Sequence, residues 1–222
     1  MSRFFEELDY QPTAIGPISL RRRRELRLDV DVLEILLGDE HLMSDLFTTS
    51  EVALAECGLG MGFTADAALN DTRIESLVIV EKLAPVIGWH ESGLIPLGKR
   101  LGDDPKCRFV EGDFFQMAAS DTGFDPVEPA RKFDAILLDI DHAPDFHLAP
   151  AHAGFYQPDG LAKLQQHLVD GGIFALWSND PPDAAFAARL QSVFRVANAV
   201  EVPFYNPLQD RDFIQSIYIA HR

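Results

Sequence analysis

Cysteine is scarce in this chain, whose 222 residues include only Cys57 and Cys107. Two cysteines are too few for a disulfide framework or a zinc cluster, and each lies inside an apolar, strand-like stretch. We therefore expect both to be small buried thiols. We also predict no metal, because no metal-ligand spacing is found among the candidate histidines His90, His147, His152 and His167.

Long apolar runs are absent as well. No segment approaches the roughly 20 apolar residues that a membrane span needs, and the N-terminus turns acidic at Glu6 and Glu7 before any apolar run develops. Hydrophobic residues nevertheless make up 47% of the chain, enough for a real core. We expect a cytoplasmic protein with no membrane partner, formed by one domain plus an appendage.

Positive charge is also in short supply: 19 Lys and Arg stand against 35 Asp and Glu, a formal net charge of −16. This balance disfavours nucleic acid as a partner, because binding it depends largely on cationic groups that displace counterions from phosphates. A cationic or neutral small acceptor is easier to accommodate. The run Arg21–Arg24 is the exception, and would suit phosphate, a partner's acidic surface or a solvated strand near a hairpin.

Within the first segment, residues 1–50, short extended runs characterise residues 15–44. Gly38-Asp39 marks a turn between β-prone segments, so we predict a small N-terminal β-hairpin region that connects to a main domain at residues 51–222.

Strand-like and helical patterns then alternate. Such alternation is typical of parallel strands joined by crossover helices, and two last runs look like a closing antiparallel pair. The pattern predicts an α/β fold with a doubly wound, mostly parallel seven-stranded sheet. The expected strands are 52–57, 77–80, 107–110, 133–138, 173–177, 197–204 and 214–220, and the expected helices are 64–70, 83–101 with a break at Pro96, 160–168 and 183–193.

A glycine-rich turn follows the first of these strands, with Gly58, Gly60 and Gly62 preceded by Glu56. A dinucleotide-binding loop reads G-x-G-x-x-G, but position 63 is Phe; acidic-x-G-x-G-x-G is the pattern of S-adenosylmethionine-dependent transferases. Glu56 would hold the α-ammonium of the donor or, in a decarboxylated donor, its propylamine. The alternative is a plain tight strand-to-helix turn.

Acidic residues end the next two strands. Glu81 comes about 20 residues after the glycines, where a carboxylate can accept both ribose hydroxyls of a nucleotide. Asp113 would reach the carboxyl edge of the sheet and accept from the amino group of adenine. Phe114 would stack on the ring or belong to the core.

The fourth strand ends in an unusual cluster of Asp139, Asp141 and His142. A sulfonium donor needs no acid to expel its neutral thioether, so the enzyme must mainly align the acceptor and remove a proton from an ammonium. We predict that all three are catalytic. Asp139 would bind and deprotonate the amine, Asp141 would help to hold it if it faces the site, and His142 would shuttle the proton unless it only caps a turn. Tyr156 and Trp177 would shape an acceptor pocket, although Trp177 suits core packing equally well.

Together these residues resemble the spermidine synthase-like branch, the polyamine aminopropyltransferases, of the class I S-adenosylmethionine-dependent methyltransferase superfamily. The resemblance implies a Rossmann-like fold that binds decarboxylated S-adenosylmethionine through Gly58, Gly60, Glu81 and Asp113, with Asp139 on the amine acceptor. Its marks are Leu37-Gly38-Asp39, Gly58–Gly62, Glu81, Gly112-Asp113, Asp139, Phe155-Tyr156 and Asp170–Gly172.

The chain departs from this family at the residues that would bind the acceptor. The family's fourth-strand motif reads D-S-S-D-P or D-S-T-D-P, whereas this chain has Asp139–Pro144, with its second aspartate displaced or replaced by His142. Residues 42–51 lack the Tyr, His and Gln that help the family hold donor and polyamine. Aminopropyl transfer, methyl transfer and a non-catalytic nucleotide-binding or assembly role therefore stay open. The hairpin edge and the C-terminal strands are candidate homodimer surfaces.

Overall fold

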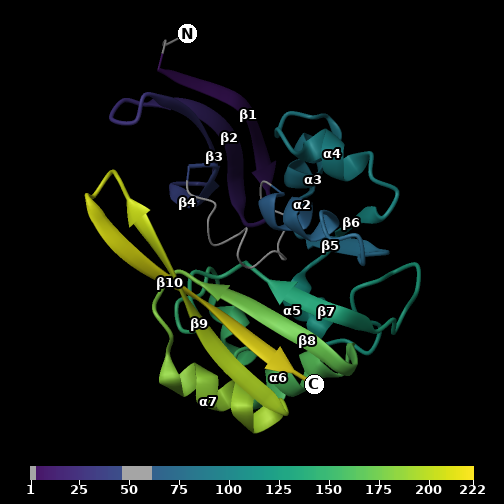
Figure 1. Ribbon diagram of the computed structural model, residues 1–222. Helices are drawn as coiled ribbons and strands as arrows, with labels where there is room; N and C mark the ends of the chain where they lie inside the picture. The colour runs from purple at the N-terminus through teal and green to yellow at the C-terminus, as the bar shows by residue number, and fades with distance from the viewer. Residues whose placement is uncertain (1–3, 47–61) are drawn as a thin grey trace.

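The computed structural model describes residues 4–46 and 62–222, and its first unit is an antiparallel sheet in the order β1-β2-β3-β4 (Figure 1). The predicted hairpin is part of this larger sheet, with Gly38 at a positive φ of 60° in the β3–β4 turn. Its first strand carries few apolar residues, so hydrophobic patterning did not reveal it. The strands are β1 (Phe5–Thr13), β2 (Gly16–Glu25), β3 (Val30–Leu37) and β4 (Glu40–Ser44).

A parallel pair of strands follows, with β5 (Leu77–Glu81) beside β6 (Cys107–Glu111). Helix α2 (Phe63–Leu69) precedes β5. The helix expected at 83–101 is two helices, α3 (Ala84–Glu91) and α4 (Gly98–Gly102). The break falls where Gly93 takes a positive φ of 72° and Pro96 has no N–H to donate to a helix.

The third unit is a mixed sheet in the order β7-β8-β10-β9. Only its β7–β8 pair is parallel, and β8, β10 and β9 pair antiparallel, as predicted for the last two strands. The helix expected at 160–168 begins earlier because Pro158 suits its first turn, and β8 begins at Leu168. The bounds are α5 (Phe114–Ala118), β7 (Phe133–Leu138), η1 (Pro150–Gly154), α6 (Pro158–Gln165), β8 (Leu168–Ser178), α7 (Ala184–Val193), β9 (Val196–Asn206) and β10 (Arg211–His221).

The α/β class is confirmed, but a continuous seven-stranded sheet is not what the described residues form. They give a two-stranded sheet and a separate four-stranded mixed sheet. The strand predicted at 52–57 lies outside the described residues. Among the described residues, no helix is long and apolar enough to cross a membrane.

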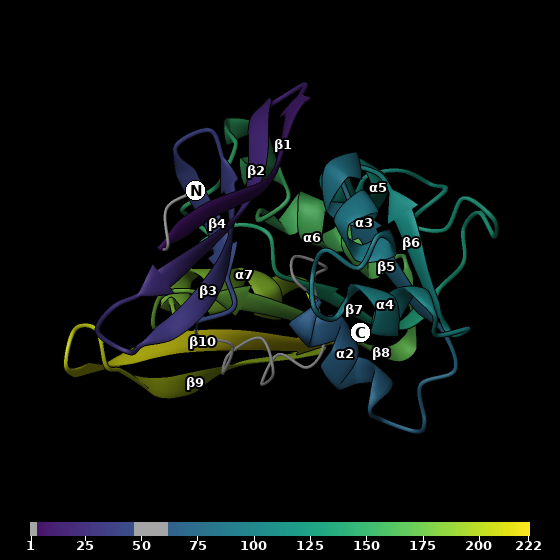
Figure 2. The same ribbon diagram turned by 90° about the horizontal axis from the view of Figure 1, so that it is seen from above.

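The N-terminal sheet shares a core with the helices beside it. Ile18, Leu20 and Ile35 are buried in one cluster with Val86 and Trp89 of α3. Figures 1 and 2 show β1 and β2 alongside α3. A hydrogen bond from Trp89 Nε1 to Asp9 Oδ2, 2.6 Å long, reinforces the contact. The N-terminal sheet is thus packed onto the helices beside it rather than tethered to the rest of the fold.

The arginine run lies on β2, where acidic side chains neutralise it. Each guanidinium in Arg21–Arg24 lies within 4.0 Å of at least one carboxylate oxygen of the same sheet or its turns. This arrangement agrees with a strand at the surface and leaves little free positive charge for phosphate. The carboxylates are those of Glu6, Glu7, Glu25, Asp29, Asp31 and Glu34.

Candidate functional site

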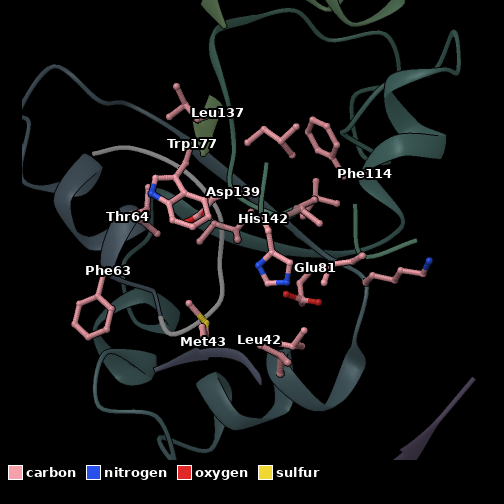
Figure 3. A pocket seen from close by; sticks show the side chains of 18 of the residues that line it. Leu42, Met43, Phe63, Thr64, Glu81, Phe114, Leu137, Asp139, His142 and Trp177 are labelled. Atoms are coloured by element: carbon pink, nitrogen blue, oxygen red, sulfur yellow. The ribbon is translucent and has the colours of Figure 1, made fainter. Parts of the chain in front are cut away.

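A cavity opens at the carboxyl ends of β5, β6, β7 and β8, the edge at which α/β sheets bind ligands (Figure 3). Residues of β3 and β4 line it on one side and the β9–β10 hairpin on another. The structure therefore brings strand ends far apart in sequence to one place. The predicted site residues on its wall are Glu81, Asp113, Phe114, Asp139, His142 and Trp177.

Of the glycine turn, only the last position is described. Glu56, Gly58 and Gly60 lie outside the described residues. Gly62 caps α2 with a positive φ of 90°, and a Cβ there would lie 2.6 Å from Leu101 Cδ1 and 3.1 Å from His90 Cε1. Both the backbone angle and the close packing require glycine at this point.

Glu81 lies at the end of β5, as predicted, and its side chain is on the cavity wall. Burial raises the pKa of its carboxyl to about 7, although N–H groups of Leu83 and Lys82 hydrogen-bond to it and act in the opposite direction. The Leu83 N–H donates to Oε1 over 2.7 Å. A ligand that donates two hydroxyl hydrogen bonds would stabilise the ionised form of this carboxylate.

Asp113 follows β6 and caps α5. Its Oδ1 accepts from the N–H groups of Phe115 and Gln116, at 3.0 and 3.1 Å, and its Oδ2 forms an ion pair with Lys82 Nζ at 2.8 Å. Burial works to raise the pKa of Asp113, but Lys82 and the two N–H groups hold it below its ordinary value. Both carboxylate oxygens thus have protein partners. Sequence reasoning missed Lys82.

Phe114 belongs to both the cavity wall and the core. It is 8% exposed and stacks on Phe124, with ring centroids 5.0 Å apart. Its edge meets Phe115, with centroids 5.6 Å apart. This position agrees with the alternative that Phe114 belongs to the core.

Asp139 and His142 both reach the cavity from the end of β7, and Figure 3 shows them there with Glu81. His142 Nε2 lies 3.4 Å from Glu40 Oε1 of β4, and its ring stacks on Phe146 with centroids 5.0 Å apart. His142 therefore links the loop after β7 to the N-terminal sheet across the cavity.

Asp141 and Tyr156 lie behind the cavity wall rather than on it. Asp141 has a fully buried side chain that accepts from the Leu148 N–H at 2.7 Å and from Tyr156 Oη at 2.8 Å. Tyr156 is 2% exposed, and burial and then the Asp141 charge raise the pKa of its hydroxyl. Neither residue is on the cavity lining, so their predicted catalytic and substrate-binding roles have no support from geometry.

His152, which the sequence suggested only as a candidate metal ligand, also lines the cavity wall. Its Nδ1 lies 2.9 Å from Asp141 Oδ1, and its ring stacks on Phe115 with centroids 3.9 Å apart. The two partners are 11 residues apart, a spacing with no motif, and only the fold of the loop brings them together.

Trp177 ends β8 on the cavity wall and packs against the small apolar cluster around Ala175 and Ile217. Its Nε1 is buried and has no hydrogen-bond partner among the described residues. Because this atom is shielded from solvent, Trp177 fits the core alternative as well as the pocket role expected for it.

The β9–β10 hairpin adds a wall that the sequence did not indicate. Phe204 and Phe213 stack on each other with centroids 5.8 Å apart, and both line the cavity. Gln215 Nε2 donates to Asn179 Oδ1 over 3.3 Å. At the hairpin tip the Leu208 carbonyl accepts from Arg27 Nη1 at 2.8 Å, which ties the hairpin to the β2–β3 turn.

The electrostatics of the wall favour a cationic ligand. Its described carboxylates are Glu81, Asp113 and Asp139, and its one described lysine is Lys82, which pairs with Asp113. Negative groups thus outnumber permanent positive charges on the described wall.

Comparison with known proteins gives the fold. No protein-family model and no curated protein matches the chain. A spermidine synthase solved with the transition-state analogue AdoDATO matches at TM-score 0.70 and 14% identity, over 97% of this chain and 73% of that one. The spermidine synthase of Thermotoga maritima matches at 0.69 and 15%, over 97% and 72%. Human methyltransferase-like protein 13, solved with SAH, matches at 0.51 and 15%, over 78% and 79%.

The fold is therefore that of spermidine synthases and S-adenosylmethionine-dependent methyltransferases, as the resemblance in the sequence implied. A match over 97% of the chain leaves few residues unmatched, so the N-terminal sheet is part of the fold shared with spermidine synthase.

Proposed function

We propose that the chain is a transferase that uses S-adenosylmethionine or its decarboxylated form as donor and a small amine as acceptor. The observation that carries this proposal is the convergence of Glu81 and Asp139, from the ends of β5 and β7, on one cavity. Gly62, the last residue of the glycine turn, opens the neighbouring helix. The fold shared with spermidine synthases and methyltransferases supports the same reading.

The chemistry asks little of the protein beyond alignment and removal of a proton. The amine nitrogen attacks the carbon bonded to the sulfonium sulfur, the C–S bond breaks, and its electron pair leaves with a neutral thioether. Asp139 holds the amine and takes the proton, directly or through water. Glu81 accepts from the ribose hydroxyls.

The charges of the wall bear on the form of the donor. A full donor carries a carboxylate, and the described wall offers it only Lys82 as a permanently charged partner, which already pairs with Asp113. A decarboxylated donor carries cationic groups alone. The described wall therefore suits aminopropyl transfer better than methyl transfer.

Calorimetric titration tests the proposal with S-adenosylmethionine, its decarboxylated form, methylthioadenosine, S-adenosylhomocysteine and NAD. Tighter binding of the decarboxylated donor and methylthioadenosine indicates aminopropyl transfer, and preference for the full donor and S-adenosylhomocysteine indicates methyl transfer. A protein that binds none of these compounds contradicts the proposal.

The role of Asp139 has its own test once an acceptor is found. Asp139→Asn removes the proton acceptor but leaves the nucleoside contacts in place, so turnover should be lost while donor affinity stays within a few-fold. Glu81→Ala is the matched variant, expected to weaken donor binding by about 1.5–3 kcal/mol through loss of hydrogen bonds to a charged group. A wild-type rate in Asp139→Asn would remove Asp139 from the mechanism.

A second candidate is a nucleotide-binding or assembly protein without turnover. Of the three residues predicted to be catalytic, Asp141 does not line the cavity, and His142 lies 3.4 Å from Glu40. The cavity wall therefore keeps only part of the predicted catalytic set. Donor binding without transfer to any of a panel of diamines and monoamines would favour this candidate.

A further inference from the structure

A histidine on the cavity wall is held from behind by a buried carboxylate. The side chain of His152 is 11% exposed and faces the cavity, whereas that of Asp141 is 0% exposed. His152 Nδ1 lies 2.9 and 3.1 Å from the two carboxylate oxygens. Asp141 also accepts from Leu148 and Tyr156, so its position is fixed by three separate donors.

This arrangement sets which ring nitrogen of His152 carries the proton. A carboxylate offers only acceptors, so Nδ1 donates to Asp141 and the neutral ring presents Nε2 as a hydrogen-bond acceptor. No described residue hydrogen-bonds to Nε2. Nε2 is separated from Nδ1 by Cε1 and points away from the buried carboxylate. It is not among the described nitrogens that are both buried and without a partner, and His152 lines the cavity, so Nε2 is accessible from there.

His152 also lies beside the residues expected at the base of the donor. Its ring stacks on Phe115, with an interplanar angle of 22°, and Phe115 follows Asp113 and Phe114 directly. Asp113, the predicted acceptor for the adenine amino group, already binds two backbone N–H groups and Lys82. Among the described residues beside Phe115, His152 Nε2 is an acceptor with no protein partner.

We propose that His152 recognises the nucleobase of the donor, with Nε2 accepting a hydrogen bond from the exocyclic amino group of adenine. Asp141 is the positioning residue that keeps the ring in this tautomer and orientation. The inference rests on the proposed function, since it places an adenine nucleoside in the cavity.

Calorimetry with two nucleosides tests this assignment. Methylthioadenosine carries the amino group, and methylthioinosine has an oxo group in its place. The wild-type protein should bind methylthioadenosine more tightly. His152→Ala should weaken methylthioadenosine binding by roughly 3- to 10-fold, the value of one hydrogen bond, and should abolish the preference between the two nucleosides.

A second histidine of the same loop provides the control. His147 packs on Tyr156 and hydrogen-bonds to the Pro144 carbonyl, but it does not line the cavity. His147→Ala disturbs the same loop and should keep the wild-type preference for the amino group. If His152→Ala does not fold, as judged by its melting curve, His152→Phe replaces it, because Phe keeps a ring on Phe115 and has no acceptor.

The outcomes separate this inference from the function on which it rests. A wild-type protein that binds neither nucleoside contradicts the proposed function itself. Binding of both with equal affinity, or an unchanged amino preference in the His152 variants, overturns the role of His152 and leaves the proposed function standing.

Discussion

Gly62 shows how strictly a single residue can be fixed by backbone and packing together. We expect Gly62→Ala to destabilise the protein by about 2 kcal/mol or more, because the positive φ and the close approach of Leu101 both oppose a Cβ. Gly88 of α3 is the matched control, since a Cβ there meets nothing within 4 Å. Gly88→Ala should stabilise by up to about 1 kcal/mol. Urea denaturation compares the two variants, and equal effects would contradict the packing argument.

Glu81 makes stability depend on pH. Its pKa rises from an ordinary value of 4.5 to about 7 on folding, so the folded protein holds this proton more tightly between those values. Its contribution to stability is therefore complete below pH 4.5 and is lost as pH rises through 7. At pH 8 the uncharged Glu81→Gln variant should have a free energy of unfolding that exceeds that of the wild type by at most about 3 kcal/mol.

The measurement is urea denaturation at pH 5 and pH 8. Glu111 ends β6 as the register partner of Glu81 and is exposed, so Glu111→Gln controls for removal of a carboxylate from a strand end. A Glu81→Gln advantage that is the same at both pH values would mean that burial does not perturb this carboxyl.

At the scale of elements, a buried aspartate joins β6 to the segment before β7. Asp125 has a fully buried side chain whose Oδ2 lies 2.6 Å from Arg108 Nη2 and 3.3 Å from Arg131 Nη1. Both arginines are partly exposed and can regain water, so we expect Asp125→Ala to cost about 2–3 kcal/mol in chemical denaturation. Asp71→Ala, which breaks a surface pair with Arg73, should change stability little.

The strands and loops also show which parts of the fold and of the site the sequence could predict. The apolar runs of β5, β6 and β7 predicted their strands, and the acidic residues after them, Glu81 and Asp139, lie on the cavity as expected. The sequence pattern could not show that the Asp141 side chain points away from the cavity, because its hydrogen-bond partners lie 7 to 15 residues away in a folded loop. Nor could it show that the β9–β10 hairpin would extend over the cavity, since that depends on the twist and length of two strands.

At the scale of the molecule, the shared core makes the N-terminal sheet and the α2–α4 helices one folding unit. Ile18 is 0% exposed in this core, so Ile18→Ala should cost about 2–5 kcal/mol. In a Trp177→Phe background, Trp89 is the one remaining tryptophan. Its fluorescence and the circular dichroism should then show unfolding in the same transition. Leu26→Ala, at a side chain that is 69% exposed, is the control. An N-terminal sheet that melts alone, without a change at Trp89, would show a separate domain.

The mixed sheet ends at β9, whose outer edge has no partner strand among the described residues. An edge strand offers unpaired backbone groups to any other extended chain, and Val196 and Val200 are exposed along it. Pro203 lies within the strand and has no N–H to donate, and Glu201 adds a charge. The edge is thereby interrupted as a template for strand addition, which protects the protein from aggregating sheet to sheet at high concentration.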